Sequence, residues 1–386
     1  MVPNGWERKP IKELCESIID CVNKTAKHVD FVTPYKMLRT TNIRNGRVDT
    51  ENVRYVEKDV YEQWIRRGAP KKGDVIFTRE APVGEAGILD DENGIFLGQR
   101  TMMYRAHPLK SDNRFLLYSL LSSYCQKQIE DFSNGGTVAH MRVPDCGEII
   151  ISTPPLLEQR KIALILSTWD RAISKTERLI DNSKLLKKAL MQQLLTGAHT
   201  QRKRLLEDSG KPFEGEWEEV ELGSILSIGS GKDYKHLSIG NIPVYGSGGH
   251  MLNVSDYLYD GESVCIGRKG TIDKPMFLAG KFWTVDTLYY THSFINSLPQ
   301  FIFQYFLTLK WRTYSEASGV PSLSKSIIEK LKITLPPLPE QQKIATVLVN
   351  ADKEIDLLEK QLADLKKEKK ALMQQLLTGK RRVKLN

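Results

Sequence analysis

The sequence predicts an α+β protein in which two mixed α/β modules are separated by two long antiparallel coiled-coil helices, with an internal pseudo-two-fold repeat. Three observations lead to this prediction. A 44-residue segment occurs twice, each copy carries a heptad pattern, and the rest of the chain shows short strand patterns between glycine-rich turns. At 386 residues the chain is also too long for one ordinary core.

The repeated segment defines the two helices. Residues 154–197 align without a gap on residues 336–379, and 24 of the 44 positions are identical. Each copy opens with two prolines, which suit a helix entrance because no amide donor is needed there. Each copy closes with Thr-Gly, a helix-ending signal at Gly197 and Gly379. Both copies are therefore predicted to be helices of about 40 residues.

The second copy carries the clearer coiled-coil seam. Its seam residues follow alternating steps of four and three, with Lys369 as the one polar member. They are Ile344, Leu348, Ala351, Ile355, Leu358, Leu362, Leu365, Lys369, Leu372 and Leu376. The first copy keeps this register, with Thr176, Ser183 and Lys187 as polar interruptions. One such stripe is typical of any helical bundle, but two gap-free copies around a globular insert favour an antiparallel pair.

The modules are repeated in outline and have diverged in detail. Trp6 with Ile11 five residues later is echoed by Trp217 with Leu222. Short strands are expected at 75–77, 95–97, 264–266 and 282–291, and short helices at 115–121 and 299–309. The expected organisation is a first module at 1–153, a first helix at 154–197, a linker at 198–215, a second module at 216–335, a second helix at 336–380 and a basic tail at 381–386.

The composition indicates a folded cytoplasmic protein with a polyanionic partner. Hydrophobic residues make up 40% of the chain, yet neither its apolar runs nor its N-terminus suit a membrane span or a signal peptide. The net charge of +9 favours a polyanion, because phosphates neutralised by Lys or Arg release counterions. Five scattered cysteines without Cys-x-x-Cys spacing are expected to be reduced structural thiols: Cys15, Cys21, Cys125, Cys146 and Cys265.

The two ends of each repeated helix resemble a known family. The Pro-Pro-Leu-x-Glu-Gln-x-Lys-Ile-Ala entrances at 154–163 and 336–345 are similar to those of specificity subunits of type I restriction-modification systems. The Lys-Lys-Ala-Leu-Met-Gln-Gln-Leu-Leu-Thr-Gly exits are similar as well. The segments 73–79, 242–249 and 261–270 resemble the target-recognition domains of that family, so that the resemblance covers essentially the whole chain.

The resemblance implies a non-catalytic subunit that recognises double-stranded DNA. In that family each target-recognition domain reads one half of a bipartite site, and the helices set the spacing and dock two methyltransferase subunits, which restriction/translocase subunits join. Because the two modules differ, the resemblance implies a non-palindromic target. S-adenosylmethionine, ATP and Mg²⁺ are expected on the partner subunits and not on this chain, in a prokaryotic cytoplasm. A helix of about 40 residues is roughly 60 Å long, which corresponds to something under about 18 base pairs.

Polar loop residues beside the predicted strands are the candidates for base reading. Arg suits guanine, and Asn or Gln suits adenine, because their paired hydrogen-bonding groups match the major-groove edges. The candidate DNA-binding residues are Arg39, Thr41, Asn42, Arg44, Arg79, Gln99 and Arg100 in the first module, and Tyr245, Ser247, Arg268 and Lys269 in the second. Each alone has the alternative of a solvated or phosphate-positioning role. The turn at 246–249 is either an ordinary hairpin turn or a backbone approach to phosphate.

Six polar residues are repeated at the helix entrances, which helix capping alone does not fully explain. Glu158, Gln159, Lys161, Glu340, Gln341 and Lys343 are therefore candidates for docking partner subunits. The basic residues at 201–204 and 380–382 follow the two helix ends at matching positions, either as solvated linkers or as phosphate contacts.

The motifs of a catalytic or metal site are not found in the sequence. The chain has no Asn- or Asp-Pro-Pro-aromatic sequence for base methylation, no phosphate-binding loop and no His-Glu-x-x-His pair. Asp145 with Glu148 lacks the nearby Glu-x-Lys that metal-dependent nuclease cores use. Two alternatives stay open: a coiled-coil adaptor that binds proteins and not DNA, and an enzyme whose motifs are unfamiliar.

Overall fold

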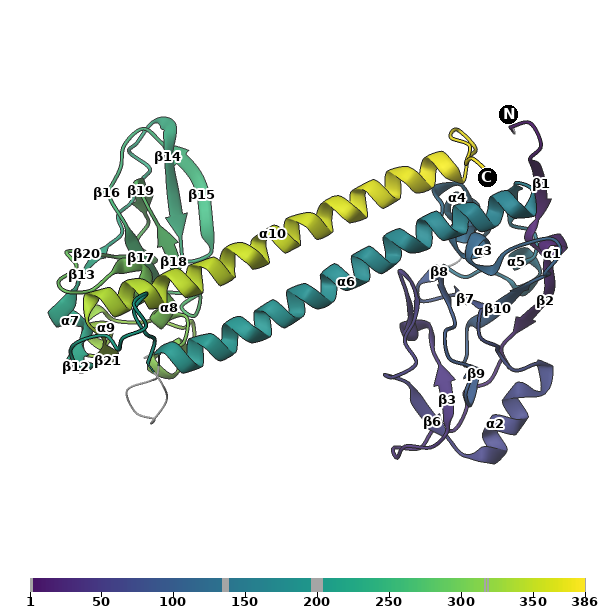
Figure 1. The fold of residues 1–386 in the computed structure, drawn as a ribbon, viewed down its shortest axis with the longest axis horizontal. Coiled ribbons are helices and arrows are strands. Elements are labelled where there is room, and N and C mark those ends of the chain that lie inside the picture. The colour runs from purple at the N-terminus through teal and green to yellow at the C-terminus, as the bar shows by residue number, and fades with distance from the viewer. Residues whose placement is uncertain (1–2, 134–138, 196–203, 316, 318, 386) are drawn as a thin grey trace. The chain divides into compact units, whose positions relative to one another are not determined.

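The computed structural model describes residues 3–133, 139–195, 204–315, 317 and 319–385, which form two compact units (Figure 1). Unit 1 is Met1–Glu177 with Gln361–Asn386, and unit 2 is Arg178–Lys360. The two long helices are α6 (Leu156–Leu195) and α10 (Leu338–Leu376). Each of them belongs partly to unit 1 and partly to unit 2.

Both long helices form where the repeated segment predicts them. Each begins directly after its proline pair, where a missing amide hydrogen removes no helix bond. After α10, Gly379 has a φ of 68°, the left-handed conformation that favours glycine beyond a helix end. The corresponding Gly197 and the basic residues 201–203 lie outside the described residues.

The module of unit 1 combines sheets with short helices. Its strands are β1 (Glu7–Pro10), β2 (Cys15–Asp20), β3 (Tyr35–Leu38), β4 (Ile43–Arg44), β5 (Gly46–Val48), β6 (Arg54–Val56), β7 (Val75–Arg79), β8 (Val83–Ile88), β9 (Ile95–Leu97), β10 (Thr101–Ala106) and β11 (Ile150–Thr153). Its helices are α1 (Ile11–Leu14), α2 (Lys58–Trp64), α3 (Asn113–Leu120), α4 (Ser123–Ser133) and α5 (Val143–Cys146). The sheet orders are β2-β10-β7-β8-β5-β4, β6-β3-β9 and β1-β11. The strands predicted at 75–77 and 95–97 are confirmed as β7 and β9.

The module of unit 2 has the same kind of architecture. Its strands are β12 (Glu218–Glu221), β13 (Ser227–Ser230), β14 (Ile239–Gly246), β15 (Gly249–Val254), β16 (Tyr259–Asp260), β17 (Ser263–Gly267), β18 (Met276–Leu278), β19 (Lys281–Thr284), β20 (Leu288–His292) and β21 (Lys332–Leu335), and its helices are α7 (Leu222–Ile225), α8 (Pro299–Phe306) and α9 (Lys325–Glu329). The sheet orders are β13-β20-β17-β18, β15-β14-β19-β16 and β12-β21.

One strand prediction in unit 2 is wrong. The segment 282–291, expected to be one strand, is split between β19 and β20. The chain turns between them, because the amide of Leu288 donates back to the carbonyl of Val285 at 2.9 Å. Val285 itself donates to the carbonyl of Tyr245 at 3.0 Å. The apolar run therefore serves two different sheets, which its composition alone does not reveal.

The two modules share one topology around a central strand. In unit 1, β7 lies between β10 and β8, and in unit 2, β17 lies between β20 and β18, with all four pairings antiparallel. Before each long helix, β1 pairs with β11 and β12 pairs with β21 in the same antiparallel manner. The predicted α+β class with an internal repeat is confirmed, and the repeat extends through modules whose sequences have diverged.

In each unit the module and its part of the helix pair share one hydrophobic core. In unit 1, Phe115 of α3 is buried in the same cluster as Leu166 of α6 and Leu376 of α10. In unit 2, Phe301 of α8 is buried in the same cluster as Leu348 of α10. Most helix stability in proteins comes from packing an apolar face. The helices are therefore held by the modules as well as by each other.

Within unit 1 the two helices run antiparallel and exchange ion pairs. Lys369 Nζ lies 2.5 Å from Asp170 Oδ1, and Lys366 Nζ lies 2.9 Å from Glu177 Oε1. The later residue of α6 therefore pairs with the earlier residue of α10, as an antiparallel pair requires.

Unit 2 repeats both ion pairs with the two helices exchanged. Lys187 Nζ lies 2.5 Å from Asp352 Oδ1, and Lys184 Nζ lies 2.6 Å from Glu359 Oε1. The paired positions are identical in the two copies of the repeat, although the middle of the repeat has otherwise diverged. The side chain of Lys187 is 14% exposed and that of Lys369 is 15% exposed, so the two lysines that interrupt the seam form largely buried ion pairs. Polar residues at such positions restrict the register of a helix pair.

Each module adds a hydrogen bond to one of these aspartates. The hydroxyl of Tyr118 on α3 donates to Asp170 Oδ2 at 2.6 Å, and Nε2 of Gln304 on α8 donates to Asp352 Oδ2 at 3.1 Å. Both are the sixth residue of their helix. Burial and the bond to Asp170 raise the pKa of Tyr118. Each module is thus tied to the residues that define the helix register.

Candidate nucleic-acid interface

The carboxyl end of β7 is held by two neighbouring segments of the first module. The amide of Arg79 donates to the carbonyl of Arg100 at 2.9 Å, and the carbonyl of Arg79 accepts from the amide of Met141 at 2.9 Å. The next residue, Glu80, forms an isolated antiparallel bridge with His140. The strand end, the turn before β10 and the segment before α5 therefore meet at one place.

The carboxyl end of β17 has the same backbone arrangement in the second module. The amide of Arg268 donates to the carbonyl of Thr287 at 2.8 Å, and its own carbonyl accepts from the amide of Leu323 at 2.9 Å. Lys269 forms an isolated antiparallel β-bridge with Ser322, as Glu80 does with His140. The duplicated scaffold thus builds one site per module, with Arg79 equivalent to Arg268 and Glu80 equivalent to Lys269.

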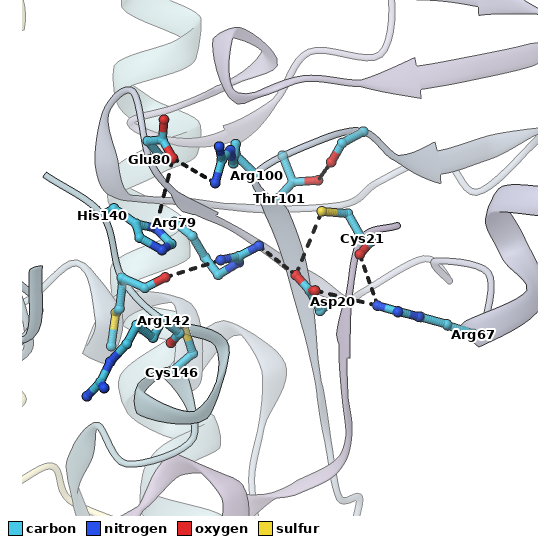
Figure 2. Close-up of polar contacts among 12 residues, drawn as sticks. Asp20, Cys21, Arg67, Arg79, Glu80, Arg100, Thr101, His140, Arg142 and Cys146 are labelled. Atoms are coloured by element: carbon cyan, nitrogen blue, oxygen red, sulfur yellow. Dashed lines mark hydrogen bonds and ion pairs between the residues drawn. The ribbon is translucent and has the colours of Figure 1, made fainter. Parts of the chain in front are cut away.

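Arg79 is turned into the protein, whereas its equivalent Arg268 is exposed. The side chain of Arg79 is 5% exposed, and its Nη2 lies 2.9 Å from Asp20 Oδ1 (Figure 2). Its Nη1 also donates to the carbonyl of Met141 at 3.2 Å. Arg67 Nη1 lies 3.5 Å from the other oxygen of Asp20. In this structure the guanidinium of Arg79 therefore braces the strand end from beneath.

Arg100, Glu80 and His140 form the outer layer of the same site (Figure 2). Arg100 Nη1 lies 3.0 Å from Glu80 Oε2, and His140 Nδ1 lies 3.9 Å from the same oxygen. Their side chains are 37%, 21% and 39% exposed in the order Arg100, Glu80, His140. The residue before Arg100, Gln99, accepts from the hydroxyl of Thr25 through Oε1 at 3.2 Å.

The other four first-module candidates gather at the β4–β5 hairpin. Asn42 is buried, and its Oδ1 accepts from the amide of Arg39 at 2.9 Å while its Nδ2 donates to the carbonyl of Asn52 at 2.8 Å. Nη1 of Arg44 donates to two carbonyls of its own loop at 2.8 and 3.1 Å. Thr41 is exposed. Both the oxygen and the nitrogen of the Asn42 side-chain amide therefore bond to the backbone and stabilise this loop.

All of this hairpin group except Arg39 line a cavity of about 650 Å³ within unit 1, between the hairpin and the helix pair. Arg47 braces the hairpin, since its Nη1 lies 3.1 Å from Glu177 Oε2 on α6. Burial by itself would raise the pKa of Glu177, but hydrogen bonds from Lys366 and Arg47 lower it. The first-module candidates therefore fall into two groups, one at the strand end and one at this hairpin.

The second-module candidates lie on two turns that touch. The segment 246–249 forms a hairpin turn, with Gly246 paired to Gly249 and a φ of 114° at Gly249. A Cβ atom placed on Gly270 would lie 3.4 Å from Ser247 Oγ, so this turn contacts the turn that carries Lys269. The ring of Tyr245, on the strand before the turn, stands edge-on to His250 with the ring centroids 5.7 Å apart.

A cavity of about 560 Å³ adjoins the turn at 246–249. Ser247, His250 and Asp286 are among the residues that line it. Arg268 reaches the same region, since its Nη1 donates to the carbonyl of Asp286 at 3.4 Å. The second module thus presents cations at the strand end where the first presents a carboxylate and an arginine.

The docking candidate Glu158 is buried at the entrance of α6. Its side chain is 2% exposed, and its oxygens accept from Trp6 Nε1 at 3.2 Å and from Nε and Nη2 of Arg382 at 2.7 and 2.8 Å. The indole and the guanidinium come from segments near the two ends of the chain. The basic tail thus contributes a structural contact in unit 1.

Glu340 occupies the equivalent place at the entrance of α10. Its Oε2 accepts from Trp217 Nε1 at 3.0 Å and from Arg204 Nη2 at 2.5 Å. Arg204 belongs to the basic segment after α6, as Arg382 belongs to the one after α10. The repeated glutamate therefore marks a repeated Trp-Glu-Arg cluster.

The entrance glutamines are also engaged inside the chain. Nε2 of Gln159 and of Gln341 donates to the carbonyl of the first entrance proline, at 2.9 and 2.8 Å. Their Oε1 atoms accept from the modules, from Ser111 Oγ at 3.0 Å and from the Leu298 amide at 2.9 Å. The two remaining candidates, Lys161 and Lys343, are half-buried, and Lys343 contacts Asp208. These contacts account for much of the repetition, and docking by the six residues stays a prediction.

The site residues that sequence reasoning missed are Glu80 and His140. The sequence criterion favoured forked donors and amides, which match guanine and adenine, and it did not select a carboxylate. The available signal was position, because Glu80 lies three residues after a predicted strand, as Lys269 does in the other module. Among the residues that the structure describes, no group of three or more His, Cys, Asp or Glu side chains is placed to hold a metal ion. No described helix is both long and apolar enough to span a membrane.

A duplicated scaffold that presents two differently charged sites at equivalent strand ends defines a tandem recognition protein. The chain belongs to the family described as type I restriction modification DNA specificity domain, whose model matches residues 3–182 and 214–367. The predictions of a type I restriction-modification specificity subunit, and of a recognition subunit and not an enzyme, are thereby confirmed.

Relatives and solved structures agree with this assignment. The chain is 26% identical to the putative type I restriction enzyme MjaX specificity subunit of Methanocaldococcus jannaschii, covering 99% of this chain and 95% of the relative. It is 28% identical to the MjaVIII specificity subunit of the same organism, covering 83% and 85%. Its fold is similar to the crystal structure of the S subunit of the type I restriction-modification system from M. genitalium, with a TM-score of 0.66 and 20% identity, covering 100% of this chain and 99% of that one.

Proposed function

We propose that this chain gives a type I restriction-modification complex its DNA sequence specificity. Each module reads one half of a bipartite, non-palindromic site on double-stranded DNA, and the helix pair sets the spacing between the halves. The chain itself carries no catalytic centre. S-adenosylmethionine, ATP and Mg²⁺ act on the partner subunits.

The observation that carries this proposal is the difference between two equivalent sites. At one strand end the outward groups are Glu80 and Arg100, and at the other they are Arg268 and Lys269. Base pairs present different patterns of donors and acceptors in the major groove. Modules with the same backbone and different charges therefore select different half-sites, which supports an asymmetric target.

Two methyltransferase subunits are proposed to dock on the helix pair, one on each unit. Support comes from leucines of the long helices that are not part of the coiled-coil seam and are exposed at the surface. In unit 1, Leu157 and Leu164 of α6 are 65% and 55% exposed, and in unit 2, Leu186 of α6 and Leu357 of α10 are 61% and 68% exposed. Leu157 and Leu164 are seven residues apart and so lie on one face of α6, and an exposed apolar helix face is typical of a surface that a partner covers. The entrance residues Lys161 and Lys343 belong to the same proposal.

Single-molecule methylation sequencing tests the proposal. DNA is sequenced from cells that carry a cognate type I methyltransferase, with and without this chain. A split, asymmetric motif that occurs only with the chain is the expected result. A methyltransferase whose motif is the same without the chain would contradict the proposal and favour the adaptor that binds proteins only.

A further inference from the structure

The Glu80–Arg100 pair carries an inference about the bases themselves. A carboxylate is repelled by the DNA backbone, so a phosphate-contacting role does not account for Glu80 at this surface. Oε2 of Glu80 faces both Arg100 and His140, while its Oε1 has no hydrogen bond to any described residue. The side chain of Arg100 is 37% exposed, and its guanidinium makes no hydrogen bond to another side chain or carbonyl among the described residues, so its donors can reach a ligand.

The backbone beneath the pair is fixed in an unusual conformation. Arg100 has a φ of 71°, and Ala81, which follows Glu80, has a φ of 54°. Non-glycine residues in this left-handed region cluster at ligand-contacting sites, where the surrounding structure enforces them. Here the enforcing contacts are the backbone bonds of Arg79 to Arg100 and to Met141, with the Arg79 side chain buried on Asp20.

We propose that Glu80 and Arg100 together read one C·G base pair in the half-site of the first module. Arg100 donates to O6 and N7 of the guanine, and Glu80 Oε1 accepts from the N4 amino group of the cytosine. These groups lie next to each other on the major-groove edge of one pair, so two side chains joined by a 3.0 Å contact meet both bases at once. The inference rests on the proposed function, and adds to it the base pair and the residues that select it.

The equivalent position in the second module supports a reading role. Glu80 corresponds to Lys269, and Arg100 corresponds to Thr287, by the same backbone bonds. The ion pairs that set the register of the long helices are the same in both copies. This position instead changes its charge from one module to the other, as expected where the modules read different sequences.

The test uses the assembled complex with its methyltransferase subunits, with Glu80→Gln and Arg100→Lys as variants and methylation sequencing as readout. Arg100→Lys keeps the charge and loses the fork that matches guanine. Its discrimination at a single C·G pair is expected to fall by about 5- to 150-fold, the range for one good base contact. Glu80→Gln is expected to relax the same base pair, because an amide no longer requires an amino donor opposite it.

Several controls separate the outcomes. Lys269→Gln in the second module is expected to affect only the other half-site. Thermal melting of each variant monitors folding, and both changes are at partly exposed side chains. The inference is overturned if the first half-site contains no C·G pair, if the two variants relax different positions, or if Arg100→Lys leaves the motif unchanged. A wild-type chain that directs no split motif would instead refute the proposed function itself.

Discussion

Single residues show how one backbone position serves two purposes. Arg79 and Arg268 occupy equivalent places, with their amides and carbonyls bonded in the same way. The side chain of the first pairs with the carboxylate of Asp20 inside its module, and that of the second donates to the carbonyl of Asp286 at the surface. The role of an arginine at this position is therefore decided by what lies beneath it.

Replacing Arg79 and Arg268 by alanine separates the two roles. Arg79→Ala leaves the exposed Arg67 as the one cation paired with Asp20 among the described residues, and breaking a buried ion pair costs about 3–5 kcal/mol of unfolding free energy. Arg268→Ala is expected to change stability by less than about 0.5 kcal/mol, as for other surface positions. Urea unfolding of both variants measures the difference, and equal effects would contradict the assignment.

The cysteines predict a pH dependence. Burial raises the pKa of Cys15, Cys125, Cys146 and Cys265 to about 12. In the unfolded chain a thiol titrates near 8.5. Between these two values the unfolded state loses protons that the folded state keeps, so stability falls as the pH rises from about 8.5 towards 12. Below about 8.5 this contribution is fully present.

Iodoacetamide labelling checks this expectation. At pH 8 the four thiols of the folded chain are expected to react at least about tenfold more slowly than in urea, since the thiolate is the reactive form. Mass spectrometry of the labelled peptides assigns each site. Equal labelling with and without urea would show that these thiols are accessible and ionised.

At the scale of elements, the long helices keep what their register requires. The middle of the repeat has diverged, yet the aspartate, glutamate and lysines of the interhelical pairs are identical in both copies. Each ion pair joins a residue of α6 to a residue of α10. Because both helices carry the same aspartate, glutamate and lysines, every ion pair in unit 1 has an equivalent in unit 2 with the two helices exchanged. The hydrogen bonds from Tyr118 and Gln304 then tie each module to the same register.

A charge exchange tests the register in unit 1. Asp170→Lys places two lysines together and removes the acceptor of Tyr118, so it is expected to lower the unfolding free energy by about 3 kcal/mol. Adding Lys369→Asp restores opposite charges and is expected to recover about 1–2 kcal/mol, as coupled neighbours do. Urea unfolding of the single and double variants gives the coupling energy. Additive effects of the two changes would exclude the pairing.

At the scale of the whole molecule, each unit is closed by segments that are distant in the sequence. In unit 1, Trp6 near one end of the chain and Arg382 near the other meet on Glu158. In unit 2 the corresponding cluster is formed by Trp217, Arg204 and Glu340. The segment after each long helix thus completes a module, and the basic tail is part of the fold of unit 1.

Removing residues 381–386 is expected to lower the melting temperature of the chain. The deletion leaves the Glu158 carboxylate buried without Arg382, which is unfavourable for an ionised group. Glu158→Gln in the shortened chain is expected to restore part of the loss, because a neutral amide needs no counter-charge. Arg204→Ala is the matched change for Glu340. Unchanged melting after the deletion would exclude a structural role for the tail.

The sequence alone determined the two long helices, the duplication, the strands at 75–77, 95–97 and 264–266, and the family. These features depend on local periodicity and on direct repetition, which survive in a one-dimensional pattern. The proline pairs, Gly379 and the seam with its interruptions at Lys187 and Lys369 were all visible in this way. The class of partner followed from net charge and from the resemblance.

Only the tertiary structure decided which side chains are outward. Arg79 was a candidate reader, but Asp20 lies on a different strand, so their pairing depends on sheet order and not on spacing. Glu80 became a candidate only when the register of β7 and β17 aligned it with Lys269. Glu158 and Glu340 looked free on a helix surface until tryptophans from distant segments covered them. Burial and pairing are properties of the packed chain, and no local pattern records them.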